Sequence, residues 1–222
     1  MKDSSFKMTT GKPLKNILVF AIPIMLTSLV QQFYNVADTY IVGRYISANA
    51  LAAVGSVGPM SSLLMGLAMG VTGGFAIPIA QAFGAGDKQR TNHYAGNAIS
   101  LTIIISLTIM SLSLFLVKPI LTLLGTPSEI FDDARLYVSI IYAGAIFTTL
   151  YNVMASILRA LGDSKAPLKF LTVTAVLNVF LNYFTIAVLG MGVDGAAIST
   201  VLSKLVSCIL CVINIRGRKE ML

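Results

Sequence analysis

The chain has 222 residues, of which 56% are apolar and 11% are charged, and its mean hydropathy is +0.83. A soluble domain of this composition would lack the polar side chains needed to cover its surface, so soluble protein classes are excluded. The net charge of +7 is carried mostly by the segments between apolar stretches. We expect these segments to face lipid headgroups, which argues against nucleic acid as a partner.

Six apolar stretches, each long enough to cross a bilayer, fill most of the sequence. A membrane-spanning helix needs about 20 apolar residues. The stretches cover residues 16–41, 51–81, 95–117, 135–158, 167–189 and 193–215. The pattern predicts an all-α membrane protein with six transmembrane helices, for which the bilayer is the first partner.

The first two stretches contain residues that bend helices. Pro23 interrupts the first stretch, and we expect a kink near it. At about 1.5 Å per residue, the second stretch is longer than a bilayer requires. It also contains Gly70, Gly73, Gly74 and Pro78. We therefore expect one bent or tilted helix with an interfacial tail.

Basic residues are distributed unevenly between the two sides of the predicted bundle. Twelve of the sixteen Lys and Arg residues fall on the side of the two termini, and three fall on the other side, namely Arg44, Lys118 and Arg135. Loops rich in Lys and Arg stay in the cytoplasm. Both termini are therefore predicted to be cytoplasmic, in a multi-pass protein of the plasma membrane.

The residues that most often carry catalysis or bind metals are scarce. Cys208 and Cys211 form a CxxC pattern inside the last stretch, where an ionised thiolate would be costly. His93 is the only histidine, too few for a zinc cluster or a Ser/His/Asp set. We expect neither an enzyme nor a bound cofactor or resident metal.

Three of the stretches carry polar side chains spaced three and four residues apart, which places each set on one helix face. The sets are Gln31, Asn35 and Asp38; Thr149, Asn152, Ser156 and Arg159; and Thr174, Asn178, Asn182 and Thr185. Polar groups are costly in lipid unless they meet a partner or a water-filled cavity. The stripes predict a polar cavity, with hydrogen bonding between helices as the alternative for any one stripe. The candidates to line this cavity are Gln31, Asn35, Asn152, Thr174 and Lys204.

Asp38 and Asn182 are both predicted to lie in the outer half of the membrane. Counted from the cytoplasmic ends of their helices, Asp38 lies about 30 Å and Asn182 about 21 Å along the axis. Desolvation disfavours the carboxylate anion, so Asp38 could take up a proton from outside. The same oxygen atoms could instead hold a hard cation such as sodium. The sequence does not distinguish proton uptake from sodium binding at this site.

Lys204 lies near the middle of the last stretch, where an unpaired lysine is costly. Asp38 is the only acidic residue in the interior of a stretch, because Asp194 lies at the very start of the last one. An interaction between Asp38 and Lys204 is therefore one hypothesis. The competing interpretation is that the Lys204 side chain snorkels or faces a water-filled cavity.

Seven segments follow one another along nearly the whole chain. They are QQFYNVADTYIVGR with Asp38, ALAAVGSVGP, AQAFGAGDKQR, LLGTPSEIFDDARLYVSI, SILRALGDSKAP, LNVFLNY and GMGVDGAAIST. Taken in this order, they resemble the multidrug and toxic compound extrusion (MATE) transporters. The resemblance implies an antiporter that exports cationic or amphipathic drug-like compounds in exchange for protons or sodium ions. It further implies one lobe of a transporter in which two six-helix lobes surround a cavity.

The resemblance also implies roles for individual residues. The first-helix aspartate, here Asp38, is implicated in cation coupling, and the fifth-helix amide corresponds to Asn178. Several relatives have an acid where this chain has Asn182. Coupling would then rest on Asp38 alone or on sodium binding assisted by Asn178 and Asn182.

The length of the chain leaves several alternatives open. Members of the family look about twice as long, so residues 1–222 are interpreted as a single N-terminal lobe without its second lobe. The chain is then a truncated form, a half-transporter that pairs with a second copy, or one part of a split pair. A related flippase for lipid-linked sugars and a non-transporting membrane module remain the alternative functions. For substrates, Met60, Met65 and Met69 could form an adaptable surface, although core packing is the more common role.

Overall fold

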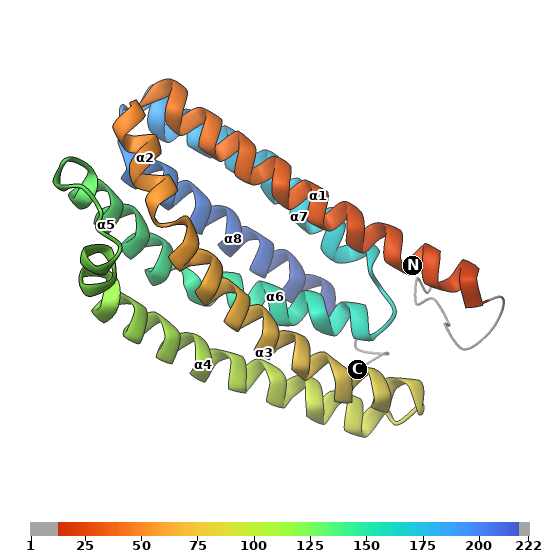
Figure 1. Ribbon diagram of the computed structural model, residues 1–222. Helices are drawn as coiled ribbons and strands as arrows, with labels where there is room; N and C mark the ends of the chain where they lie inside the picture. The colour runs from red at the N-terminus through yellow and green to blue at the C-terminus, as the bar shows by residue number, and fades with distance from the viewer. Residues whose placement is uncertain (1–12, 218–222) are drawn as a thin grey trace.

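The computed structural model describes residues 13–217, and all regular structure in that range is helical (Figure 1). The α-helices are α1 (Pro13–Tyr45), α2 (Ala48–Ser56), α3 (Gly58–Gly84), α4 (Lys88–Leu123), α5 (Ser128–Ala143), α6 (Ala145–Ala160), α7 (Lys165–Asn182) and α8 (Val193–Arg216). A short π-helical segment, η1 (Tyr183–Val188), continues α7. The prediction of an all-α membrane protein is confirmed.

The number of membrane spans agrees with the six predicted from the sequence. In the described part of the chain, five helical segments are long and apolar enough to cross a bilayer. Helices α5 and α6, which are bent by 45° relative to each other, supply the sixth when they are counted as one span. The predicted fourth helix over 135–158 is therefore a broken one that begins earlier, at Ser128, and ends at Ala160.

The first span is one continuous helix, whereas the second is interrupted. Helix α1 continues through Pro23 as a single helix of 33 residues. The second span consists of two helices, α2 and α3, which meet at Val57, rather than the one bent or tilted helix that was expected. Ser47 caps the start of α2, Pro59 lies in the first turn of α3, and α3 runs through Pro78. The interfacial tail stays a prediction.

The helices form a bundle in which α1 and α7 lie side by side along one edge (Figure 1). Helices α3 and α4 pair along the opposite edge, and α6 and α8 pack between these pairs. The two described ends of the chain lie at the same end of the bundle, as an even number of spans requires (Figure 1). That this end is cytoplasmic stays a prediction, and several of its charges, including Lys2, Lys7 and Lys12, fall outside the described residues.

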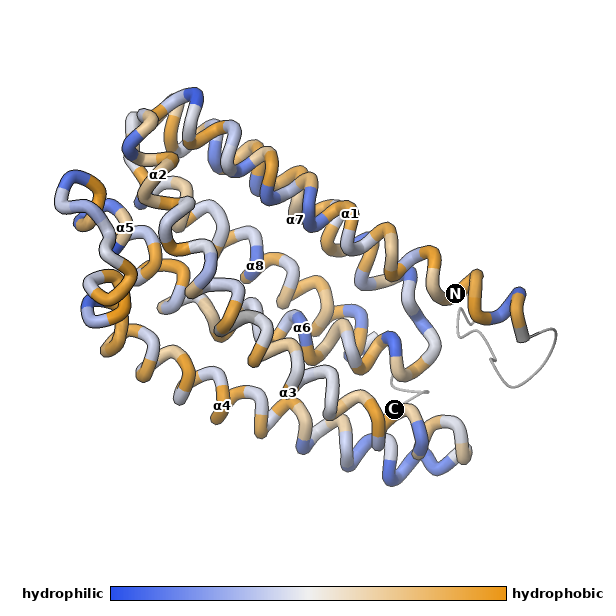
Figure 2. Tube along the Cα trace, viewed as in Figure 1, coloured by the Kyte–Doolittle hydropathy of each residue, from blue (hydrophilic) through white to orange (hydrophobic). Residues whose placement is uncertain are grey.

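Apolar side chains fill two buried clusters, and many others are exposed on the outside of the bundle. Apolar residues are distributed along the length of the helices (Figure 2). One cluster joins α2, α5 and the start of α8, and the other joins α3, α6 and the end of α8. Cys208 and Cys211 are buried free thiols in the second cluster. On the outside, Phe33 and Phe115 are 73% and 81% exposed, as expected for side chains that face lipid.

The bend between α5 and α6 brings their junction very close to α8. A Cβ atom placed on Gly144 would lie 2.4 Å from Cγ2 and 2.6 Å from Cγ1 of Val201. Only glycine fits this approach, which fixes where α6 starts along α8 and so positions the polar face of α6.

Candidate functional site

Asp38 of α1 meets the two asparagines of α7 in the interior of the bundle. The Asn182 amide nitrogen Nδ2 donates to Asp38 Oδ1 at 2.5 Å and to Asn178 Oδ1 at 3.1 Å. Asp38 is 7% exposed, and both asparagines are fully buried. The three residues predicted as a cation-coupling site therefore lie together, in one hydrogen-bonded cluster.

The local structure of α7 explains why its two amides point at α1. Asn178 and Asn182 are one helical turn apart and so share a face. Asn182 is the last residue of α7, and the chain continues as the π-helical segment η1. Such widened turns occur frequently at functional sites, because they shift the following side chains around the helix axis.

Two polar atoms of the cluster have no hydrogen-bond partner among the described residues, Asn182 Oδ1 and Asn178 Nδ2. Beside the cluster, the hydroxyl groups of Tyr34 and Thr200 lie close to each other. Buried polar groups are normally paired, so each exception calls for an explanation. A carboxylate, an amide oxygen and hydroxyl oxygens are the ligands that hard cations prefer, and a carboxylate in dry surroundings is also a proton acceptor.

Tyr34 and Thr200 were not among the residues singled out from the sequence. Tyr34 lies one turn before Asp38 on α1, within electrostatic range of its carboxylate. The spacing of four residues from Asp38 was the available signal. Thr200 belongs to α8, where it lies four residues before Lys204, beside the stripe of Ser199, Ser203 and Ser207. That spacing was the available signal for α8.

The other predicted cavity residues have mixed surroundings. Gln31 and Asn152 are half-buried, whereas Asn35 is exposed and its amide lies 3.4 Å from Gln32 Oε1. Thr174 is buried and accepts a hydrogen bond from Ser207 of α8 at 2.7 Å. For Thr174 the alternative interpretation, bonding between helices, is therefore the one observed.

Two further residues of the polar stripes also bond across helices. The hydroxyl oxygen of Thr185 in η1 lies 3.0 Å from that of Ser199 in α8, within hydrogen-bond distance. The hydroxyl group of Thr149 forms a hydrogen bond with that of Ser106 in α4. Only part of each stripe faces the interior site.

Lys204 does not pair with Asp38, so that hypothesis is wrong for this structure. Among the described residues the one ion pair within 4.0 Å joins Arg90 and Asp87. The Lys204 ammonium instead lies 5.0 Å from the ring centroid of Tyr34 and 5.9 Å from that of Tyr151. Aromatic rings attract a cation at such distances, which is how Lys204 is accommodated without a carboxylate.

Comparison with known proteins places the chain in a family. The family model described as MatE matches residues 23–184. The chain belongs to the MatE family. Two Bacillus subtilis relatives are described as the probable multidrug resistance proteins YoeA and YpnP. The chain is 29% identical to YoeA over 93% of its own length and 32% identical to YpnP over 90%.

Solved structures of MatE family members share the fold. One of them is described as the outward-facing conformation of a multidrug resistance MATE family transporter of the MOP superfamily. It is 30% identical, with a TM-score of 0.89 over 97% of this chain and 48% of its own. The chain also spans only 45% of the length of YoeA and YpnP. It is thus a multi-pass membrane protein with the fold of one lobe of a MatE transporter.

Proposed function

We propose that this chain is the N-terminal lobe of a secondary active exporter, an antiporter rather than an enzyme. It moves cationic or amphipathic drug-like compounds out of the cell in exchange for protons or sodium ions. The observation that carries the proposal is the hydrogen-bonded cluster of Asp38, Asn178 and Asn182. The family membership and the names of the multidrug relatives support the transport class.

The cluster offers a simple way to exchange a cation. Asp38 supplies the single negative charge, and Asn182 supplies an amide that can turn either its N–H or its oxygen toward that carboxyl. With Asp38 ionised, the amide N–H donates to it; with Asp38 protonated, the rotated amide accepts from it. A sodium ion would use the carboxylate and the unpartnered Asn182 oxygen instead.

A second half is part of the proposal, because α1 exposes polar side chains along the bilayer-spanning part of its length. They are Ser28, Gln32, Asn35 and Thr39, spaced four, three and four residues apart. Lipid is a poor neighbour for such a stripe. Its spacing supports a water-lined cleft between this lobe and another six-helix lobe, or a second copy of the chain.

Transport by purified protein in liposomes tests the proposal. An imposed proton or sodium gradient should drive accumulation of a cationic dye such as ethidium, and Asp38→Asn should abolish it. Asp133→Asn is the matched control, because it removes the same charge from an exposed position at the start of the fourth span. Whichever gradient drives uptake identifies the coupling ion.

The alternative functions predict different results in the same assay. If neither gradient drives uptake by the chain alone or with its second half, the chain is a non-transporting module. If the wild type and Asp38→Asn take up ethidium equally, Asp38 does not couple uptake to the cation gradient. A flippase for lipid-linked sugars would move such lipids between leaflets and leave ethidium outside.

A further inference from the structure

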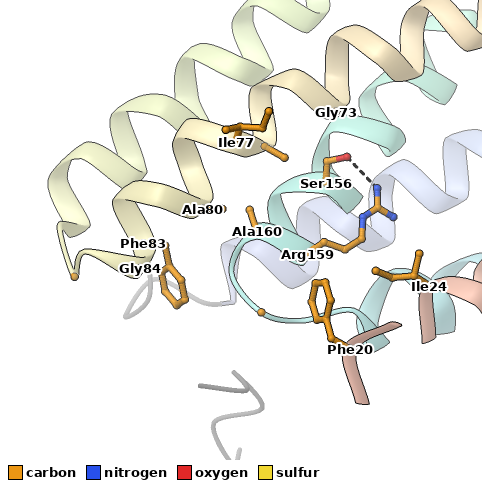
Figure 3. A pocket seen from close by; sticks show the side chains of 13 residues that line it. Phe20, Ile24, Gly73, Ile77, Ala80, Phe83, Gly84, Ser156, Arg159 and Ala160 are labelled. Atoms are coloured by element: carbon orange, nitrogen blue, oxygen red, sulfur yellow. Dashed lines mark hydrogen bonds between the residues drawn. The ribbon is translucent and has the colours of Figure 1, made fainter. Parts of the chain in front are cut away.

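A second feature of the bundle is a pocket that lies at the opposite end from Asp38, beside the turns that follow α3 and α6. Its volume is about 830 Å³, and its walls come from α1, α3 and α6. Apolar walls are formed by Phe20 and Ile24 of α1 and by Ile77 and Phe83 of α3 (Figure 3). The pocket is large enough for a drug-sized molecule.

Among the described residues, one cation lines this pocket, and none of their carboxylates pairs with it. The Arg159 guanidinium donates a single hydrogen bond to Ser156 Oγ, at 2.9 Å (Figure 3). No carboxylate of the described residues lies within 4.0 Å of it. Asp163, the next acid along the chain, directs Oδ1 to the backbone N–H groups of Lys165 and Ala166 at the start of α7.

An unpaired guanidinium in such surroundings is costly. Arg159 belongs to the last turn of the membrane-spanning helix α6 and is half-buried among apolar side chains. A partly desolvated charge is stabilised when an opposite charge and further hydrogen bonds reach it. The guanidinium has five N–H donors in a fixed fork that matches a carboxylate or a phosphate.

We infer that this pocket binds an amphipathic anion, with its carboxylate or phosphate on Arg159 and its apolar body against Phe20, Ile24 and Ile77. The inference goes beyond the proposed transport function, since it gives the lobe a second binding site, one for acidic amphiphiles. The cationic drugs that the family resemblance implies would be repelled by Arg159 at this position.

Binding of a dansyl-labelled undecanoate to the full chain in phosphatidylcholine nanodiscs tests this inference. Dansyl fluorescence should rise and saturate as the probe enters the pocket. Dodecanoate and dodecyl phosphate should displace the probe, whereas dodecyltrimethylammonium, with the same alkyl chain and the opposite charge, should not. Arg159→Gln should weaken probe binding about tenfold or more, the usual effect of losing a charge-assisted pair of hydrogen bonds.

Three further variants separate binding from misfolding. Arg159→Lys keeps the charge without the fork and should give intermediate affinity. Ala80→Phe fills the pocket from α3, leaves Arg159 in place and should also prevent binding. Lys169→Gln removes an exposed cation from α7 and should bind the probe as wild type does. Circular dichroism and size-exclusion chromatography verify that each variant is folded.

Two outcomes overturn the inference: equal displacement by the alkylammonium, or affinity for the undecanoate that neither Arg159→Gln nor Ala80→Phe reduces. Nanodiscs containing phosphatidylglycerol distinguish the source of the anion. If that lipid competes with the probe and Arg159→Gln removes the competition, the site binds a lipid headgroup. If it does not compete, the site takes a solute. Because binding needs no ion gradient, it stands or falls independently of ethidium uptake.

Discussion

Replacing Gly144 by alanine tests how the broken fourth span is held against α8. The added methyl group would lie 2.4 Å and 2.6 Å from the two γ-carbons of Val201 and 3.0 Å from its Cβ. Ordinary carbon–carbon contacts are about 3.5–4.0 Å. The backbone of Gly144, with φ −87 and ψ 0, is accessible to alanine, so the steric contact is the cause of any loss.

The expected cost follows from which atoms can move. Val201 is β-branched, and its side chain has little rotational freedom in a helix. Relief therefore requires α6 and α8 to separate by about 1 Å, which resembles overpacking of a core and costs about 1–3 kcal/mol. The higher helix propensity of alanine recovers at most about 1 kcal/mol.

Unfolding of the purified protein, followed by circular dichroism in a fixed detergent, measures this loss. Gly96→Ala is the matched control, because nothing lies within 4 Å of its added Cβ and it lies inside α4. That control should keep or slightly raise the stability. Val201→Ala combined with Gly144→Ala should restore part of the loss, with a coupling energy of about 0.5–3 kcal/mol.

Wild-type stability of Gly144→Ala would refute the close approach between the α5–α6 junction and α8. If Val201→Ala does not restore any of the stability lost in Gly144→Ala, the contact with Val201 is not the cause of the loss. Either result would also remove the argument that the contact between Gly144 and Val201 sets the position of α6, and so of its polar face, along α8.

Three more predictions concern single side chains. Asp163→Ala removes the acceptor for two backbone N–H groups at the start of α7 and should lower the unfolding free energy by about 1 kcal/mol in the same measurement. Thr185→Val removes a hydroxyl pair with Ser199 and should cost about 0.6 kcal/mol; a loss above about 2 kcal/mol would mean more than an ordinary contact between helices. Lys204→Met should change the unfolding free energy by less than about 1 kcal/mol, since it removes both the attraction of the ammonium to two rings and the cost of burying that charge. Ethidium uptake by this variant should still depend on Asp38. Equal uptake by Lys204→Met with and without Asp38→Asn would contradict that dependence.

The membrane spans could be predicted because a helix that crosses a bilayer must consist mostly of apolar residues. Runs of about 20 apolar residues identify helices without any knowledge of their neighbours. The breaks at Val57 and Gly144 were not predicted, since they depend on contacts between helices. Gly144 in particular reads as one small residue among many until Val201 of α8 is placed against it.

The same distinction separates the correct and incorrect statements about polar residues. Periodicity placed Asn178 and Asn182 on one face, and counting along the helices put Asn182 and Asp38 in the same, outer half of the membrane, so their meeting could be anticipated. Pairing Lys204 with Asp38 rested only on the lack of another acid. That reasoning failed because the rings of Tyr34 and Tyr151 also accommodate a cation, and sequence spacing does not reveal them.

Helix α1 links the two sites that the structure brings into view. Its first half contributes Phe20 and Ile24 to the apolar pocket, and its second half contributes Asp38 to the polar cluster. Ile24 and Asp38 are 14 residues apart, or about 21 Å along the helix. Because α1 packs mainly on α7 and exposes much of its remaining surface, it is the membrane-spanning helix that can shift with the fewest lost contacts. Any such shift would change the walls of the pocket and the distance from Asp38 to Asn182 together.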